Sequence, residues 1–208
     1  YGTEYTREQI NQALESDDPL ALVPSTDTNG HGTFLAGIAA GGFLPEEDFT
    51  GAAPECELLI VKLKPAKQYL RDFYLVSSDA DAYQENDIMM GIKYLRVEAF
   101  SRGKPLVILL GIGSNLGSHE GTSPLSVMLQ DISRYLGTAT VIAAGNETGR
   151  GHHYMGTIPT GESSVDVEIR VGQPESQRGF VVELWASTID TYSVGFLSPS
   201  GETISRIP

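Results

Sequence analysis

The sequence predicts an α/β fold in which a parallel β-sheet carries helices on both faces and is followed by an antiparallel β segment. Two observations predict it. Short apolar runs at 58–63, 106–110 and 140–144 alternate with segments of helical periodicity, which is the order of βαβ units. After about residue 160, apolar and polar residues alternate with period two between turn sequences, as in antiparallel strands. We therefore expect two parts, at 1–160 and 161–208.

Local start and stop signals delimit the helices. The expected helices are a short one near 7–15, a small-residue run from 31 to 42, a periodic segment at 86–102, and one that starts at 123–124 and runs to 135 or 136. Thr6 and Gln9 have the spacing of a capping box. Ser123 followed by Pro124 is a typical N-cap and first helical residue, and Gly103 is a typical stop.

The predicted strands differ between the two parts. The runs at 58–63, 106–110 and 140–144 are apolar throughout, as in strands buried on both faces of a parallel sheet. The alternating segments lie at 165–171, 180–184 and 194–196. Ligands bind at the carboxyl ends of the strands in open α/β sheets, so we expect His31 and residues 111–113 at the same end of the sheet.

Composition excludes several classes of protein. The 208 residues hold 14 Lys+Arg against 27 Asp+Glu, a net charge of −13, which argues against nucleic acid as a partner. No run of about 18 apolar residues is present, so we expect no membrane span. The single cysteine, Cys56, forms neither an internal disulfide nor a cysteine zinc site, and we expect it to be a small buried residue. No metal or cofactor is expected.

Two motifs carry candidate chemistry. His31 lies at the first turn of a helix of small residues, in Asn-Gly-His-Gly-Thr-Phe-Leu-Ala-Gly-Ile-Ala-Ala-Gly. A helix N-terminus disfavours the imidazolium, which leaves a neutral ring able to accept a proton. Asn146 follows the third apolar run, in Val-Ile-Ala-Ala-Gly-Asn-Glu. Taken singly, the first motif is also explained by a structural histidine and the second by a turn.

In this order, and with Gly-Ala-Ala-Pro at 51–54 and Gly-Ile-Gly at 111–113, the motifs resemble those of the subtilisin-like serine proteases, the subtilases. The resemblance implies that His31 is the general base and that the side chain of Asn146 donates a hydrogen bond to the oxyanion. It also implies that a polypeptide substrate pairs as an added strand with Gly111, Ile112 and Gly113, and that Ala144 and Gly145 form the other wall of the first specificity pocket.

Two further residues imitate the family's catalytic groups. Ser123 stands in Gly-Thr-Ser, the start of the family's nucleophile motif, but it precedes Asn146 and has the sequence of a helix N-cap. Asp27 lies only four residues before His31, and no Asp-Ser/Thr-Gly motif precedes that histidine. We therefore expect the chain to be inactive by itself and to need the remainder of its catalytic domain. The alternative is a pseudoprotease that binds a polypeptide without cleaving it.

The alternating tail resembles one branch of the subtilases, which contains clostridial spore-germination proteases. In that branch a jelly-roll β-domain is inserted between the asparagine and the serine motifs. The resemblance implies that 1–160 is a partial catalytic domain and that 161–208 begins the inserted domain. It also implies a serine endopeptidase of bacterial origin that is secreted or associated with spores.

Overall fold

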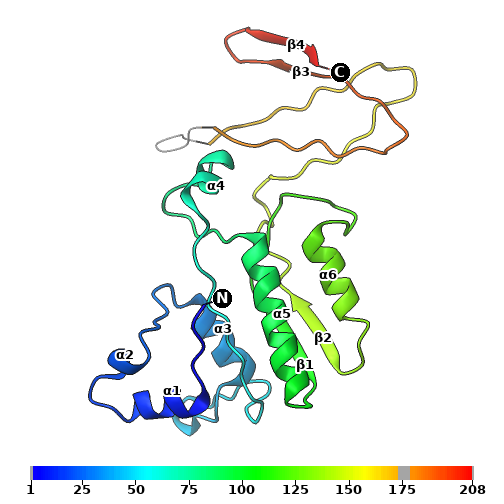
Figure 1. Ribbon diagram of the computed structural model, residues 1–208. Helices are drawn as coiled ribbons and strands as arrows, with labels where there is room; N and C mark the ends of the chain where they lie inside the picture. The colour runs from blue at the N-terminus through cyan, green and yellow to red at the C-terminus, as the bar shows by residue number, and fades with distance from the viewer. Residues whose placement is uncertain (1, 173–178, 208) are drawn as a thin grey trace. The chain divides into compact units, whose positions relative to one another are not determined.

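The computed structural model describes residues 2–172 and 179–207, which form two compact units divided between Ile60 and Val61. The first unit contains α1 (Arg7–Leu14), α2 (Pro19–Leu22), α3 (His31–Ala40) and the 3₁₀ helix η1 (Pro45–Glu47). The second contains α4 (Gln68–Phe73), α5 (Glu85–Ser101), β1 (Leu106–Leu110), α6 (Pro124–Ile132), β2 (Thr138–Ile142), β3 (Val194–Leu197) and β4 (Thr203–Ile207) (Figure 1). None of the helices in these described ranges is both long and apolar enough to cross a membrane.

The predicted capping box begins α1. The N–H of Thr6 donates to Oε1 of Gln9 at 2.8 Å, and the N–H of Gln9 donates to Oγ1 of Thr6 at 3.4 Å. The helix packs on α2, a four-residue helix that the sequence analysis did not predict. There the Asp18 carboxylate accepts from the N–H of Ala21 at 3.3 Å, so a local cap followed by Pro19 starts this short helix.

The end of α3 is tied to the segment that follows it. The N–H groups of Gly51, Ala52 and Ala53 donate to the carbonyls of Gly41, Ile38 and Ala39 at 2.9, 3.0 and 2.8 Å. These bonds satisfy carbonyls that have no partner within the helix. The backbones approach so closely that a Cβ on Gly51 would lie 2.4 Å from the nitrogen of Gly41, so only glycine fits there.

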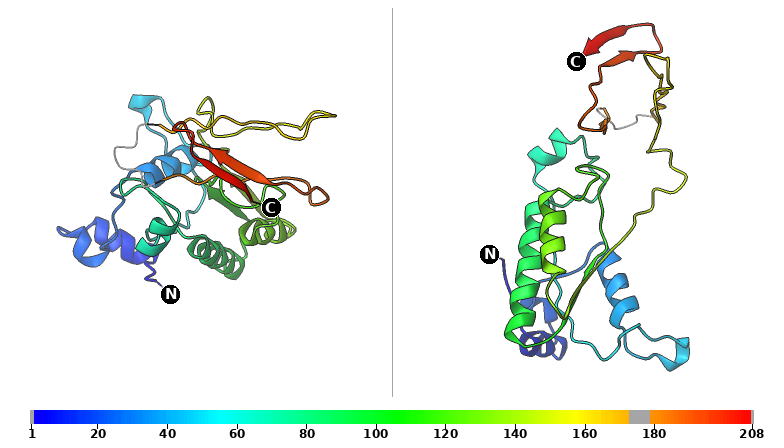
Figure 2. Two further views of the ribbon diagram at one scale, coloured as in Figure 1. Left: turned by 90° about the horizontal axis from the view of Figure 1, so that it is seen from above. Right: turned by 90° about the vertical axis from the view of Figure 1, so that its right-hand side faces the viewer.

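A parallel pair of strands forms the centre of the second unit. β1 pairs with β2 in the register Leu106↔Thr138 to Leu110↔Ile142. α5 and α6 lie side by side on one face of this pair (Figure 2), where Ile92, Ile108, Leu129 and Ile132 form the buried core. Val107 and Leu109, which alternate with Ile108, are 69% and 46% exposed. The predicted α/β class with a parallel sheet and helices is confirmed.

The predicted strand at 58–63 is wrong for this structure, because the segment joins neither ladder among the described residues. Leu58 and Ile60 are 52% and 67% exposed, although Val61 packs on α5, with its Cγ1 3.0 Å from the position a Cβ would take at Gly91. An apolar run favours burial but does not supply a partner strand. Cys56, just before this run, is exposed and not buried as expected.

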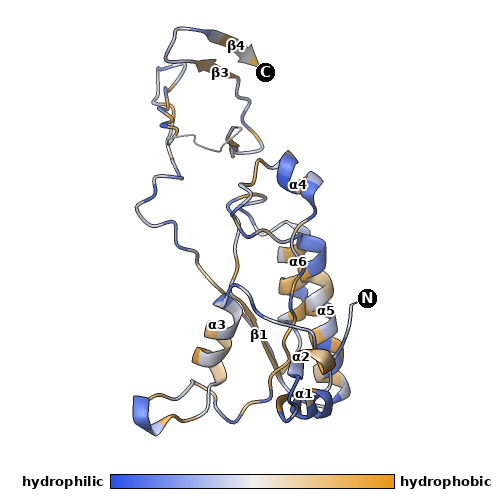
Figure 3. Ribbon diagram, turned by 90° about the vertical axis from the view of Figure 1, so that its left-hand side faces the viewer, coloured by the Kyte–Doolittle hydropathy of each residue, from blue (hydrophilic) through white to orange (hydrophobic). Residues whose placement is uncertain are grey.

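The tail holds a smaller antiparallel sheet than the alternation predicts. β3 pairs with β4, which confirms the antiparallel character of this part. The described residues at 165–171 and 180–184 form no strand, and the turn expected between them lies mostly outside the described residues. Hydropathy distinguishes the elements of the chain: β1 and much of α3 are hydrophobic, whereas α4 is hydrophilic (Figure 3).

Candidate active site

Two segments that the sequence assigns to the active site follow the ends of the two paired parallel strands. Leu110 at the end of β1 pairs with Ile142 at the end of β2, and the N–H of Ala143 donates to the carbonyl of Leu110 at 3.0 Å. Residues 111–113 follow β1 and residues 144–146 follow β2. These six residues, called the strand-end edge below, therefore lie at the carboxyl ends of neighbouring strands, where open α/β sheets bind ligands.

Asn146 is the polar side chain of the strand-end edge. Gly145 before it has a φ of +85°, a left-handed conformation that glycine adopts without strain. Asn146 itself is exposed, so its amide group, which carries two N–H donors, is accessible to a molecule bound at the edge. Asn146 therefore offers an accessible hydrogen-bond donor directly after the backbone of Ala144 and Gly145.

The loop after Asn146 is closed by two hydrogen bonds that the sequence analysis missed. Nδ1 of His152 lies 2.5 Å from Oε2 of Glu147, and the N–H of Arg150 donates to the carbonyl of Glu147 at 3.0 Å. A carboxylate and an imidazole five residues apart, with glycines between them, are the signal that indicates such a pair. Within the described ranges no three His, Cys, Asp or Glu side chains gather as metal ligands would.

His31 belongs to the first unit, whereas the strand-end edge belongs to the second. It is the first residue of α3 and is exposed. Its N–H donates to Oδ1 of Asn29 at 3.2 Å, and Gly30 before it has a φ of +85°. A left-handed glycine thus turns the chain into the helix at the position that presents the imidazole.

Asp27 holds the N-terminus of α3. Its Oδ1 accepts from the N–H groups of Asn29 and Gly30 at 3.1 and 2.8 Å, and its Oδ2 accepts from the N–H and the hydroxyl of Thr33 at 3.0 and 2.7 Å. The bond from Gly30, followed by those from Thr33, holds the pKa of Asp27 well below its ordinary value. Asp27, which lies too close to His31 to match the family's aspartate, therefore has a structural role in holding the first turn of α3.

Ser123 is also a cap, as the sequence predicts. Its Oγ accepts from the N–H of Ser126 at 3.2 Å at the start of α6. A second group supports the same turn, because the N–H of Leu125 donates to Oε1 of Glu85 at 3.1 Å. Ser123 therefore has a structural task that is independent of any imidazole.

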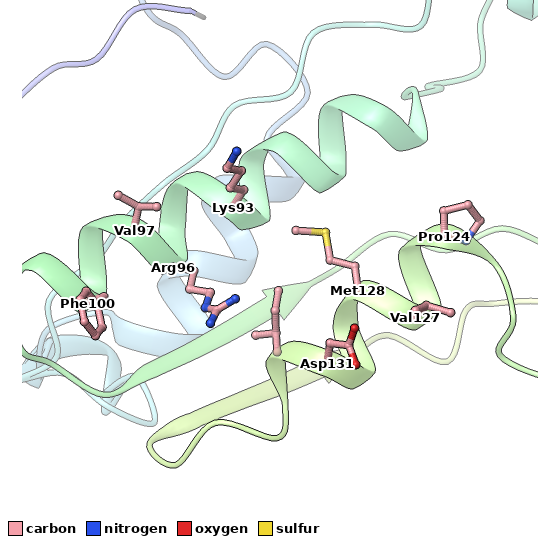
Figure 4. Close-up of a pocket in the computed structure, with 9 residues that line it drawn as sticks. Lys93, Arg96, Val97, Phe100, Pro124, Val127, Met128 and Asp131 are labelled. Carbon is pink, nitrogen blue, oxygen red and sulfur yellow. The ribbon is translucent and has the colours of Figure 1, made fainter.

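A groove of about 680 Å³ is lined by residues of α5 and α6 (Figure 4). Its lining is mostly apolar, with Phe100 87% exposed, and its charged groups are Lys93, Arg96 and Asp131. Arg96 lies over the ring of Tyr135 at 4.0 Å from the centroid. None of the lining residues carries a hydroxyl or thiol nucleophile, so this groove is not the candidate active site.

Comparison with known proteins identifies relatives of the chain. The model of the subtilase family matches residues 4–195. The solved structure of the CspB protease of Clostridium perfringens matches with a TM-score of 0.62 and 33% sequence identity, over 73% of this chain and 30% of that chain. The chain therefore spans less than a third of this structural neighbour. A search of curated proteins gives no match.

Proposed function

The chain belongs to the subtilase family, and we propose that it supplies the general base, the oxyanion donor and part of the substrate-binding edge of a serine endopeptidase. His31 takes the proton of a serine nucleophile, and Asn146 donates to the oxyanion. A polypeptide substrate pairs with residues 111–113 as an added strand, and Ala144 and Gly145 form the opposite wall of the pocket.

The observation that carries this proposal is the juxtaposition of 111–113 and 144–146 at the ends of two paired strands. In this proposal, a peptide paired with 111–113 has its backbone close to 144–146. The exposed amide of Asn146 can then donate a hydrogen bond to a carbonyl oxygen of that peptide. Hydrogen-bond donors aimed at a developing oxyanion are effective because they are already oriented before the reaction.

The way in which α3 is held supports the role of His31. Asp27 fixes the N-terminal turn, and Gly51 with its neighbours fixes the C-terminal turn. A general base must stay within hydrogen-bond reach of its proton donor, so a helix held at both ends suits an imidazole with this task.

The nucleophile and its orienting aspartate come, in this proposal, from outside these 208 residues. Residues 1–160 are then part of the catalytic domain, and 161–208 begin an inserted antiparallel β domain, as in the clostridial spore-germination branch. Residues 1–208 alone do not hydrolyse peptides, because an imidazole without a nucleophile to activate cannot perform acyl transfer.

The test uses the protein that carries this chain together with its flanking sequence. A fluorophosphonate probe, which labels activated serines, is expected to label it at a serine outside residues 1–208 and to stop its hydrolysis of peptide substrates. Labelling at Ser123 that depends on His31 would contradict the proposal. A protein that binds peptides but is neither labelled nor active would instead be the pseudoprotease of the alternative interpretation.

A further inference from the structure

A small cluster connects the tail to the loop that follows residues 111–113. Oε2 of Glu183 accepts from the N–H of Gly117 at 3.3 Å and from the indole N–H of Trp185 at 3.1 Å. The ring of Trp185 stacks on that of His119, with centroids 4.8 Å apart and an angle of 22° between the planes. Two tail residues thus hold the loop 114–122 at two points, one on its backbone and one on a side chain.

The loop 114–122 contains no helix or strand, and its own hydrogen bonds all join residues at most four positions apart. Gly117 and Gly121 have φ values of +100° and +71°. Serine hydroxyls provide local bonds, such as those from the N–H of Leu116 to Ser114 at 3.0 Å and from the N–H of Glu120 to Ser118 at 3.2 Å. Glycine-rich backbone loses much conformational entropy when it is ordered, so contacts from outside the loop have a large influence on its position.

The position of this loop matters for the strand-end edge. The loop begins directly after Gly113 and ends at Ser123, the N-cap of α6. Its far end is fixed by that cap, whereas its near end continues from the backbone with which a substrate would pair. A peptide binds more tightly to an edge that is already ordered, because ordering the edge during binding would oppose the association.

We propose that Glu183 and Trp185 are positioning residues, which clamp the loop 114–122 and so keep the strand-end edge ready to bind an extended peptide. The inference rests on the proposed function, because it takes residues 111–113 as the substrate-binding strand. It also gives the tail a role in substrate binding. The contact that provides this role joins Gly117 and Glu183, which are 66 residues apart in the sequence.

The test combines amide hydrogen exchange with kinetics on the protein that carries this chain. In Trp185→Ala and Glu183→Ala, exchange at 111–122 is expected to become faster, and KM for a peptide substrate to rise about 2- to 10-fold, the range for loss of an aromatic pair. The value of kcat is expected to stay within about twofold, since neither residue touches the reacting atoms. Trp185→Phe keeps a ring for stacking and is expected to recover most of the loss.

Tyr192→Ala is the matched control, because Tyr192 is an aromatic residue of the same tail whose hydroxyl bonds to the nearby Asp190. It is expected to leave both exchange at 111–122 and KM unchanged. Unchanged exchange at 111–122 in Trp185→Ala and Glu183→Ala would overturn the clamp. A fall in kcat without a rise in KM would overturn the positioning role. If the unsubstituted protein has no turnover, the proposed function and the substrate role of the clamp both fail, while exchange still decides whether the clamp exists.

Discussion

Thr33 donates both its backbone N–H and its hydroxyl to a single oxygen of Asp27, at 3.0 and 2.7 Å. This pair closes the first turn of α3, the turn that carries His31. The other oxygen of Asp27 accepts from the N–H groups of Asn29 and Gly30. A carboxylate with two accepting oxygens therefore joins the loop before the helix to the helix itself.

Asp27→Asn is expected to lower the midpoint of thermal unfolding at neutral pH, because an amide offers one accepting oxygen in place of two. The lowered pKa of Asp27 fixes the pH dependence. Its stabilisation is complete above the unfolded-state pKa of about 4 and is lost as the pH falls through the lower folded-state pKa. The difference between the two proteins should therefore shrink only below about pH 4. Asp17→Asn, at an exposed position in the same unit, should show no such difference.

Gly51→Ala is expected to destabilise the protein by about 1–3 kcal/mol, the usual cost of inserting an atom where there is no room. The added Cβ would lie 2.4 Å from the nitrogen of Gly41 and 2.9 Å from backbone atoms of Ala40, which cannot move without releasing the end of α3. Gly42→Ala is the control, because its Cβ would meet nothing within 4 Å. Equal unfolding midpoints for the two variants in urea would contradict the close contact.

Ile108→Ala is expected to cost about 2–5 kcal/mol of unfolding free energy, because Ile108 is 1% exposed at the centre of the core. Val107→Ala, one residue earlier in β1 at a position 69% exposed, should cost about 0.5 kcal/mol or less. Denaturant unfolding of both variants measures the difference. Similar losses of unfolding free energy in the two variants would contradict the finding that only the Ile108 face of the sheet is covered, by α5 and α6.

Ser123→Ala is expected to lower stability by about 0.5–2 kcal/mol through loss of the α6 cap, and to leave peptidase activity in place. Ser123→Asp should restore the stability, since aspartate caps helices as well as serine does but cannot act as a serine nucleophile. Loss of activity in the aspartate variant, with stability retained, would make Ser123 a catalytic residue and would contradict its assignment as a cap.

Much of the second unit could be predicted from local sequence. α5, α6, β1 and β2 have strong apolar patterns and clear stops, so their order and type follow from periodicity. The same reasoning failed at 58–63, because a strand also requires a partner, which no local pattern reveals. α2 was missed because one cap and one proline decide so short a helix.

For the candidate site, the sequence predicts the positions of those residues that directly follow strands. The pairing of β1 with β2 brings 111–113 beside 144–146, as strand order and parallel direction predict. The role of Asp27 depends on a bond to Thr33, six residues away, and the contact of Glu183 with Gly117 spans 66 residues. Such contacts depend on the path of the backbone between the two residues, which cannot be predicted from composition or from the spacing of motifs.

The kinetics of His31→Ala and Asn146→Ala test the central claim most directly, in the protein that carries this chain with its flanking sequence. His31→Ala should abolish peptide hydrolysis, because no other group takes the proton of the nucleophile. Asn146→Ala should reduce kcat by about 10²–10³ with a smaller effect on KM, a magnitude known from a subtilisin and carried over through family membership. His153→Ala and Asn11→Ala, at exposed positions outside the proposed site, should keep full activity. Full activity in both His31→Ala and Asn146→Ala would show that neither residue is catalytic and would contradict the account.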